Sequence, residues 1–164
     1  MNELEEWKDI TGYNNFEVSN KGEIRNKINN TIKKQYLRNG YYSTSLYENK
    51  VSKTLNIHRI VAIEFLGNFP NKHVNHKDGN KLNNIKENLR LASSSDNCKN
   101  CKKNIKNTSG CKGISFRKDI NKWSVYINID KKRKHLGNFS NFIYACVVRK
   151  RAEKKYYKQW RCNR

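Results

Sequence analysis

The feature that most constrains this chain is its excess of positive charge. Of its 164 residues, 35 are Lys or Arg and 14 are Asp or Glu, which leaves a formal net charge of +21 at pH 7. Such a charge repels itself in a compact fold, and proteins usually tolerate it because a polyanion neutralises it. A nucleic acid is therefore the first candidate for a partner, and an anionic membrane surface is the second.

Hydrophobic content and cysteine usage narrow the class of protein further. Only 35% of the residues are hydrophobic, but the chain contains 3 Trp, 9 Tyr and 6 Phe. Disordered chains are poor in aromatic residues, so we expect small cores beneath basic surfaces. No apolar run approaches the roughly 18–20 residues that span a bilayer, and the acidic start at residues 2–6 is unlike a signal peptide. The five cysteines then favour reduced thiols and an intracellular location.

Turn signals divide the first part of the chain into short strands. Asn39-Gly40 is a strong hairpin signal, and Ser19-Asn20-Lys21-Gly22 marks an earlier turn. Apolar residues at helical spacing predict a helix over 57–66, which Gly67 and Pro70 end. The strands predicted around the turns are residues 16–18, 23–25, 35–37 and 41–47.

Short strands, turns and helices are also predicted in the second half of the chain. Residues 73–104 predict the order strand, turn, strand and helix, with the helix capped by hydroxyl and carboxylate side chains at 93–96. A Lys- and Asn-rich linker at 102–108 follows, and then three alternating strands and a helix that Ser140 caps. The three strands are predicted at residues 113–117, 122–129 and 133–139.

The segment His73-Val74-Asn75-His76-Lys77-Asp78-Gly79-Asn80 has residue types that phosphodiester hydrolysis requires. A water molecule must lose a proton as it attacks, and a neutral His can take that proton near pH 7. The transition state and the leaving oxygen need a counter-charge, which one divalent metal ion held by oxygen ligands can supply. A strand–loop–strand–helix unit would place His76 at a strand end, facing an oxygen ligand on the helix.

At these residues the chain resembles the His-Asn-His (HNH) endonucleases, and most closely the homing enzymes of phages. By this resemblance His76 is the general base, and Asn75 and Asn97 are ligands of one Mg²⁺ or Mn²⁺ ion. Asn88 would hold the ββα-metal loop of the catalytic centre together. Many relatives carry Asp at the position of Asn75, and a neutral amide binds Mg²⁺ more weakly than a carboxylate. The matching text lies at residues 58–62, 74–80, 83–84, 87–90 and 96–97.

Simpler interpretations exist for several of these residues. A His beside a Gly turn is often only a hydrogen-bonding loop residue, and spacing alone says little in so Asn-rich a chain. The continuous text over 76–90 is what favours a nuclease. We interpret His58 and His73 as structural or phosphate-contacting residues. Structural zinc is not expected, because Cys98-x-x-Cys101 with Cys111 lacks the second close pair that such sites commonly have.

Both flanking segments resemble DNA-binding modules. Residues 5–50 resemble the nuclease-associated modular domain of phage enzymes, on matching text between residues 6 and 25. This resemblance implies DNA contact through exposed Lys and Arg. We expect Trp7, Tyr13 and Phe16 of this segment in the core. Residues 108–157 resemble the ethylene-response-factor type of domain, in which strand side chains facing away from the helix read the major groove.

We therefore expect an α+β protein of three modules: a small β-rich module at 5–52, a ββα-metal nuclease core at 53–104, and a three-stranded sheet plus helix at 108–160. It would be a monomeric, site-preferring nickase of double-stranded DNA, encoded by a phage or virus and acting in the host cytoplasm. A non-catalytic DNA-binding regulator is the alternative that Asn75 leaves open, and an RNA-binding or ribosome-associated protein is a second. The expected DNA contacts are Arg25, Arg59, Arg90, Arg117, Trp123, Tyr126 and Lys134.

Overall fold

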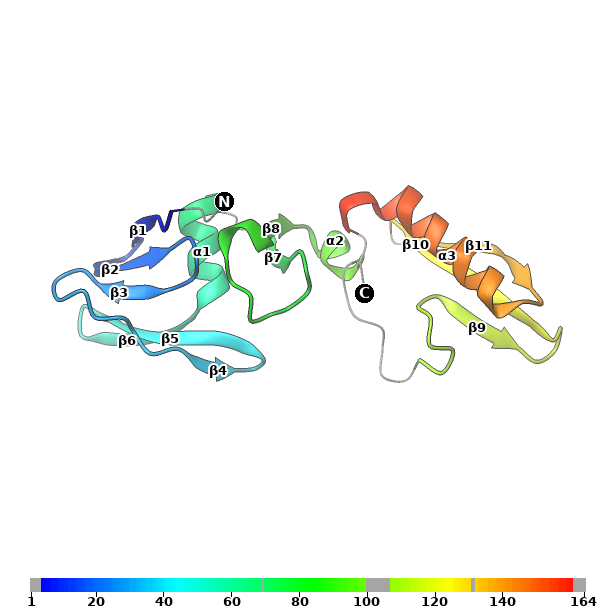
Figure 1. Ribbon diagram of the computed structural model, residues 1–164, viewed down its shortest axis with the longest axis horizontal. Coiled ribbons are helices and arrows are strands. Elements are labelled where there is room, and N and C mark those ends of the chain that lie inside the picture. Colours follow the sequence, from blue (N-terminus) through cyan, green and yellow to red (C-terminus); the bar gives the residue numbers. More distant parts are fainter. Residues whose placement is uncertain (1–3, 69, 100–106, 131, 161–164) are drawn as a thin grey trace. The chain divides into compact units, whose positions relative to one another are not determined.

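The computed structural model describes residues 4–68, 70–99, 107–130 and 132–160. The chain divides into two compact units, residues 1–94 and 95–164, and the mixed α+β class is confirmed (Figure 1). Cys101 and residues 102–106 of the predicted linker lie outside the described residues. In the described part of the chain, no helix is long and apolar enough to cross a membrane.

The first unit contains two three-stranded antiparallel sheets, one helix and a short hairpin (Figure 1). The first sheet has the order β1-β2-β3, the second β4-β5-β6, and β7 pairs with β8. The elements are β1 (Trp7–Ile10), β2 (Tyr13–Ser19), β3 (Ile24–Asn26), β4 (Tyr36–Arg38), β5 (Tyr41–Glu48), β6 (Val51–Asn56), α1 (Ile57–Leu66), β7 (His73–His76), the 3-10 turn Lys86–Asn88 and β8 (Leu89–Ala92).

One hydrophobic core joins most strands of the first unit to α1. Val18 of β2, Leu46 of β5 and Leu89 of β8 meet the buried face of α1, and each is at most 2% exposed. The predicted helix over 57–66 is confirmed residue for residue. β6 was not predicted, because it is largely polar and exposed and is held by its register with β5.

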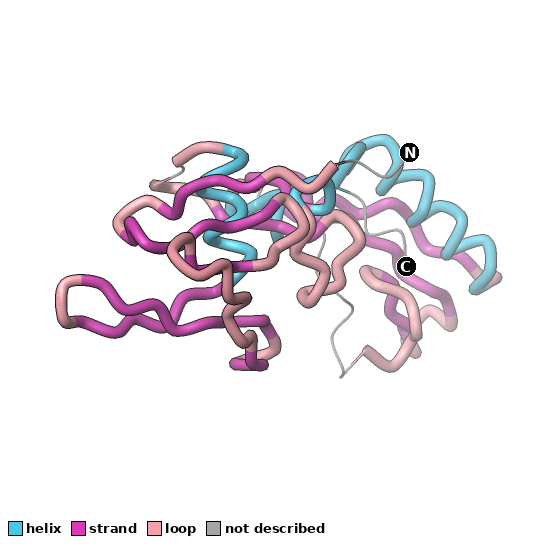
Figure 2. Tube along the Cα trace, turned by 60° about the vertical axis from the view of Figure 1, so that its left-hand side comes forward, coloured by secondary structure: helices cyan, strands magenta, loops and turns pink. Residues whose placement is uncertain are grey.

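The second unit pairs one antiparallel sheet with one long helix, which runs along the sheet in Figure 2. Ala145 and Ala152 of the helix are buried against Val125 and Ile127 of the central strand. The predicted cap at Ser140 is wrong: Asn141 is the N-cap, and its side chain accepts a hydrogen bond from the Tyr144 amide at 2.9 Å. The elements are α2 (Ser94–Lys99), β9 (Ile114–Arg117), β10 (Lys122–Ile129), β11 (Lys132–Phe139), α3 (Phe142–Tyr157) and the 3-10 turn Lys158–Trp160, with sheet order β11-β10-β9.

The shared core of the first unit predicts a large stability loss for Leu46→Ala. Leu46 is fully buried, so its truncation should lower the free energy of unfolding by about 2–5 kcal/mol. Urea unfolding followed by circular dichroism measures this value. The control is Tyr47→Ala, the next residue of β5, which is 59% exposed and should change stability by less than about 0.5 kcal/mol. Equal losses in the two variants would contradict the shared core.

Candidate active site

Asn88 organises the loop that connects β7 and β8. Its Oδ1 accepts a hydrogen bond from the Asp78 amide at 3.0 Å, and its Nδ2 donates to Asp78 Oδ1 at 3.0 Å and to the Asn83 carbonyl at 2.8 Å. The Asn88 carbonyl also accepts from the Lys77 amide at 2.8 Å. These bonds suit the loop-holding role that the sequence assigned to Asn88, whose part in catalysis stays a prediction.

The carboxylate of Asp78 is hydrogen-bonded within the same loop. Its carboxylate accepts hydrogen bonds from the Asn80 amide at 2.7 Å and from Asn83 Nδ2 at 2.8 Å. Burial acts to raise the pKa of Asp78, but these hydrogen bonds and the one from Asn88 outweigh it, so the pKa lies below the ordinary value of 3.8. Asp78 is therefore a carboxylate at neutral pH, and its charge stabilises the loop that follows His76.

His76 lies at the end of β7 and is only 6% exposed. Its Nε2 is 3.2 Å from Oδ1 of Asn84, which is itself 5% exposed. An amide oxygen can only accept a hydrogen bond, so this contact favours the tautomer that carries its proton at Nε2 and its lone pair at Nδ1. Burial lowers the pKa of His76, although the bond to Asn84 and the charge of Asp78 oppose this. The ring is therefore neutral at pH 7, as a general base must be.

A second buried imidazole, His58, covers His76 from the first turn of α1. Their ring centroids are 5.3 Å apart in an edge-on arrangement, and Tyr41 of β5 lies 4.7 Å from His58. Burial first, and then the charges of His76, Arg59 and Lys81, lower the pKa of His58 to about 3. Its Nδ1 has no hydrogen-bond partner among the described residues. His73, which the sequence analysis grouped with His58, is exposed, and its Nε2 lies 3.0 Å from Ser94 Oγ.

The two predicted metal ligands lie in different units. Asn75 is 5% exposed and faces Arg90 across the hairpin, with its Oδ1 accepting from Arg90 Nε at 2.9 Å. Asn97 lies on α2 in the second unit, and its pairing with Asn75 stays a prediction. Amide oxygens are hard donors that suit Mg²⁺ or Mn²⁺. Within the described ranges, no group of three or more His, Cys, Asp or Glu could hold a metal ion.

Arg25, a predicted DNA contact of the first unit, is packed against its own sheet. Arg25 stacks over the Trp7 ring, 4.0 Å from its centroid, and pairs with Glu17 at 2.8 Å. This ion pair makes Arg25 part of the packing of the first sheet. Phe16 and Tyr13 belong to the core as predicted, while Trp7 is half-buried.

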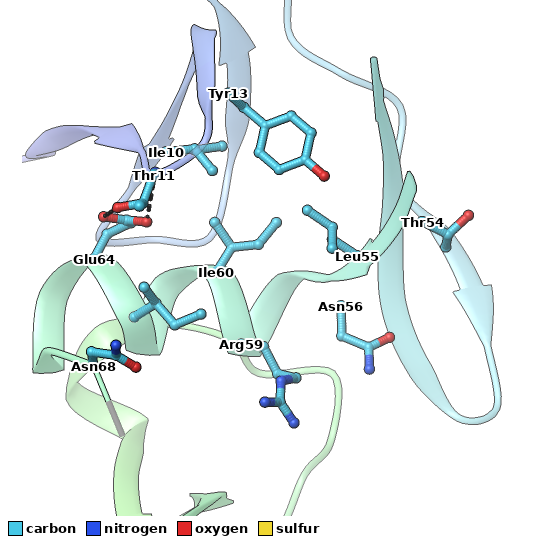
Figure 3. Close-up of a pocket in the computed structure, with 11 residues that line it drawn as sticks. Ile10, Thr11, Tyr13, Thr54, Leu55, Asn56, Arg59, Ile60, Glu64 and Asn68 are labelled. Atoms are coloured by element: carbon cyan, nitrogen blue, oxygen red, sulfur yellow. Dashed lines mark hydrogen bonds between the residues drawn. The ribbon is translucent and has the colours of Figure 1, made fainter. Parts of the chain in front are cut away.

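Arg59 is exposed on α1 and lines a groove of about 570 Å³. Figure 3 shows Tyr13, Leu55 and Ile60 gathered in this groove, while Thr11 bonds Glu64 at its edge. The exposed guanidinium of Arg59 is therefore available to a phosphate group.

Two of the four predicted contacts in the second unit face the wrong way. Trp123 packs against Phe142 of α3 with ring centroids 4.6 Å apart, and Lys134 Nζ donates to Tyr156 of α3 at 3.2 Å. The expectation that they face away from the helix is wrong, because the alternation of β10 and β11 puts them on the helix side. Tyr126 lies on the other face beneath Arg133, which is 3.8 Å from its ring centroid. Arg117 is exposed and pairs with Asp119.

Three cysteines of the second unit lie in the described residues. Cys111 Sγ and Cys146 Sγ lie 3.0 Å apart, and Cys98 is exposed. All three are free thiols, and burial raises the pKa of Cys146 to about 11. A thiol with a raised pKa is a poor nucleophile at neutral pH, so Cys146 is unsuited to nucleophilic catalysis.

Comparisons with known proteins find relatives of both parts of the first unit. Two family models match the chain: the NUMOD4 motif over residues 5–47 and an HNH endonuclease model over residues 56–99. An uncharacterized HNH endonuclease of Acanthamoeba polyphaga mimivirus is 44% identical over 121 residues, which cover 73% of this chain and 34% of that protein. DNA endonuclease I-HmuI of Bacillus phage SP01 is 42% identical over 98 residues, which cover 58% of this chain and 56% of that protein.

A solved structure covers more of both chains. The structure of the HNH homing endonuclease I-HmuI, whose title concerns DNA binding and cleavage, matches with a TM-score of 0.55 and 30% sequence identity. The match covers 93% of this chain and 91% of that chain. The match spans 34% of the length of the mimivirus relative and 56% of the length of the phage SP01 relative. It spans nearly all of the solved chain.

The buried neutral His58 predicts a steep loss of stability in acid. The unfolded state binds a proton at the ordinary His pKa of 6.5 and the folded state only near 3, so the stabilisation is complete above pH 6.5 and is lost as the pH falls toward 3. The loss should be about 1.4 kcal/mol per pH unit in that window. Urea unfolding of wild type and His58→Leu between pH 7 and pH 4.5 measures it, with His73→Leu as the exposed control. If the free energy of unfolding of wild type and of His58→Leu fell equally with pH, the burial of a neutral ring would be contradicted.

Proposed function

Because the chain belongs to the HNH homing endonuclease family, we propose that it hydrolyses phosphodiester bonds of double-stranded DNA with His76 as the general base. The observation that carries this proposal is the setting of His76. The ring is buried at a strand end and bonded through Nε2 to Asn84, and burial lowers its pKa. These features give a neutral imidazole with its lone pair at Nδ1, which is the form that accepts a proton.

In the proposed reaction, Nδ1 of His76 takes a proton from the water that attacks the phosphorus. The ring then becomes positively charged inside a buried site. Two neighbours stabilise that charge, because the Asn84 hydrogen bond and the Asp78 carboxylate both favour the protonated ring. Asn88 contributes indirectly, since it fixes Asp78 in the loop.

HNH nucleases are generally metal-dependent, and we assign one Mg²⁺ or Mn²⁺ ion to Asn75 and Asn97. Such an ion, when bound, supplies positive charge to the transition state and the leaving oxygen. The donor set fits a hard cation, since Asn75 offers an amide oxygen. That oxygen also accepts from Arg90 Nε. A carboxylate at this position would bind the metal more tightly, because it carries a negative charge that the amide lacks. Arg90 would add positive charge beside the scissile phosphate.

The substrate follows from charge and from the relatives. A net charge of +21 favours phosphate contacts and predicts binding that weakens steeply with salt. We assign contacts to the exposed Arg59 and Arg117, and to Tyr126 on the open face of the second sheet. One catalytic centre in a monomer cuts one strand per encounter, so we propose nicking. The relatives come from a phage and a giant virus, which suggests a virus-encoded enzyme that acts in the host cell.

A supercoiled-plasmid assay tests the proposal. Wild type with Mg²⁺ or Mn²⁺ should convert supercoiled DNA to open circles, and His76→Ala should slow this by at least about a hundredfold, because the base is lost. The matched control is His73→Ala, an exposed His three positions earlier on the same strand, which should cut like wild type.

The possible failures of this assay point to different errors. If wild type shifts duplex DNA in a gel but never relaxes the plasmid with any metal, the chain is a DNA-binding regulator with an inactive centre. If His76→Ala cuts as fast as wild type, another group is the base. Preference for structured RNA over duplex DNA would contradict the assigned substrate.

A further inference from the structure

We propose that Asn84 is a positioning residue that fixes the tautomer of His76, and that the β2–β3 turn at Gly22 holds Asn84 in place. The NUMOD4 segment would then be part of the active site as well as a DNA contact. The inference rests on the proposed role of His76 as the base. It adds a residue and a whole segment to the catalytic centre.

The first step is the contact between Asn84 and His76. Both side chains are at least 94% buried, and Asn84 Oδ1 lies 3.2 Å from His76 Nε2. The two neutral tautomers of an imidazole differ little in energy in water. A buried acceptor at Nε2 selects the Nε2–H form, because the other form would put two lone pairs against each other. Asn84 thereby directs the basic nitrogen, Nδ1, away from itself.

The second step is the contact between Asn84 and the β2–β3 turn. Gly22 has φ +89°, and a Cβ atom placed on it would lie 3.2 Å from Asn84 Cβ and 3.3 Å from the Asn84 carbonyl oxygen. The turn therefore packs directly on the backbone of Asn84. One hydrogen bond crosses this contact, because the Lys86 amide donates to the Asn20 carbonyl at 2.8 Å. The turn itself is held by Gln35, whose Nε2 donates to the Gly22 carbonyl at 2.8 Å.

The third step is a further contribution from the same segment. Tyr41 of β5 has its ring centroid 6.2 Å from His76 and 4.7 Å from His58, and Lys81 Nζ lies over it at 4.6 Å. Gly22 and Tyr41 belong to the NUMOD4 match at residues 5–47, whereas Asn84 and His76 belong to the HNH match at 56–99. The surroundings of His76 are thus assembled from both matches.

Substitutions at Asn84 test the first part directly. In the full chain labelled with ¹⁵N-histidine, the ring nitrogens of wild-type His76 should show the Nε2–H tautomer at neutral pH. Asn84→Asp keeps an acceptor oxygen and should keep that tautomer at a pH at which its ring is neutral, whereas Asn84→Leu, which has similar size and no acceptor, should lose it. Nicking by Asn84→Leu should fall roughly 10- to 100-fold with unchanged DNA affinity. Asn84→Asp should retain most of the rate once the pH is high enough to keep its His76 ring neutral, because the added carboxylate raises the pKa of that ring.

Gly22→Ala tests the second part against a matched control. Gly12 has a similar φ of +81° but nothing within 4 Å of an added Cβ, so Gly12→Ala introduces the same backbone strain without touching Asn84. Gly22→Ala should shift the His76 ring signals and lower the nicking rate, and Gly12→Ala should do neither, with folding of each variant checked by circular dichroism.

The inference is overturned if Asn84→Leu keeps the Nε2–H tautomer and the full rate, or if the two glycine variants behave alike. The ring-nitrogen signals do not depend on cleavage. A wild-type protein that never cuts DNA would therefore defeat the proposed function and leave the positioning by Asn84 and Gly22 open to measurement.

Discussion

The burial of the His76 ring is the constraint on which the rest of the site depends. A charged imidazole is costly away from water, and it is costlier still in a chain of net charge +21. The resting ring is therefore neutral, and the loop around it supplies hydrogen-bond partners within the protein. Asn84 satisfies Nε2, and Asn88 and Asp78 satisfy the loop that follows. The same burial leaves the protonated ring dependent on Asn84 and Asp78 during the reaction.

The ring of His76 can be buried because the β1–β6 part of the chain and the β7–β8 hairpin share one core. The buried residues of β1, β2, β3 and β5 and Leu89 of the β7–β8 hairpin belong to one cluster, and α1 joins them through Ile57, Ile60 and Val61. The helix begins at the end of the second sheet, and its first turn presents His58 to His76. The sheets, the helix and the catalytic loop are therefore one packing unit, which explains how a turn as distant in sequence as Gly22 can contact Asn84.

Local patterns in the sequence predicted the helix over 57–66, most strands and the place of His76 at a strand end, because periodicity and turn residues act over a few positions. They could not predict contacts between distant residues, such as Asn84 with Gly22, although Asn84 lay inside the matching text. Alternation divides a strand into two faces without telling which face a helix covers, and so Trp123 and Lys134 were assigned to the wrong face. Ser140 and Asn141 are both good caps, and the structure alone decides between them.

The pH dependence of the single-turnover nicking rate tests the central claim most directly. Burial lowers the pKa of His76 below its ordinary value of 6.5, so more than half of the base is neutral at pH 6.5. The pH at which the wild-type rate falls to half its maximum should therefore lie below 6.5. A rate that is already at half its maximum at pH 6.5 or above would contradict a buried, neutral His76 as the base.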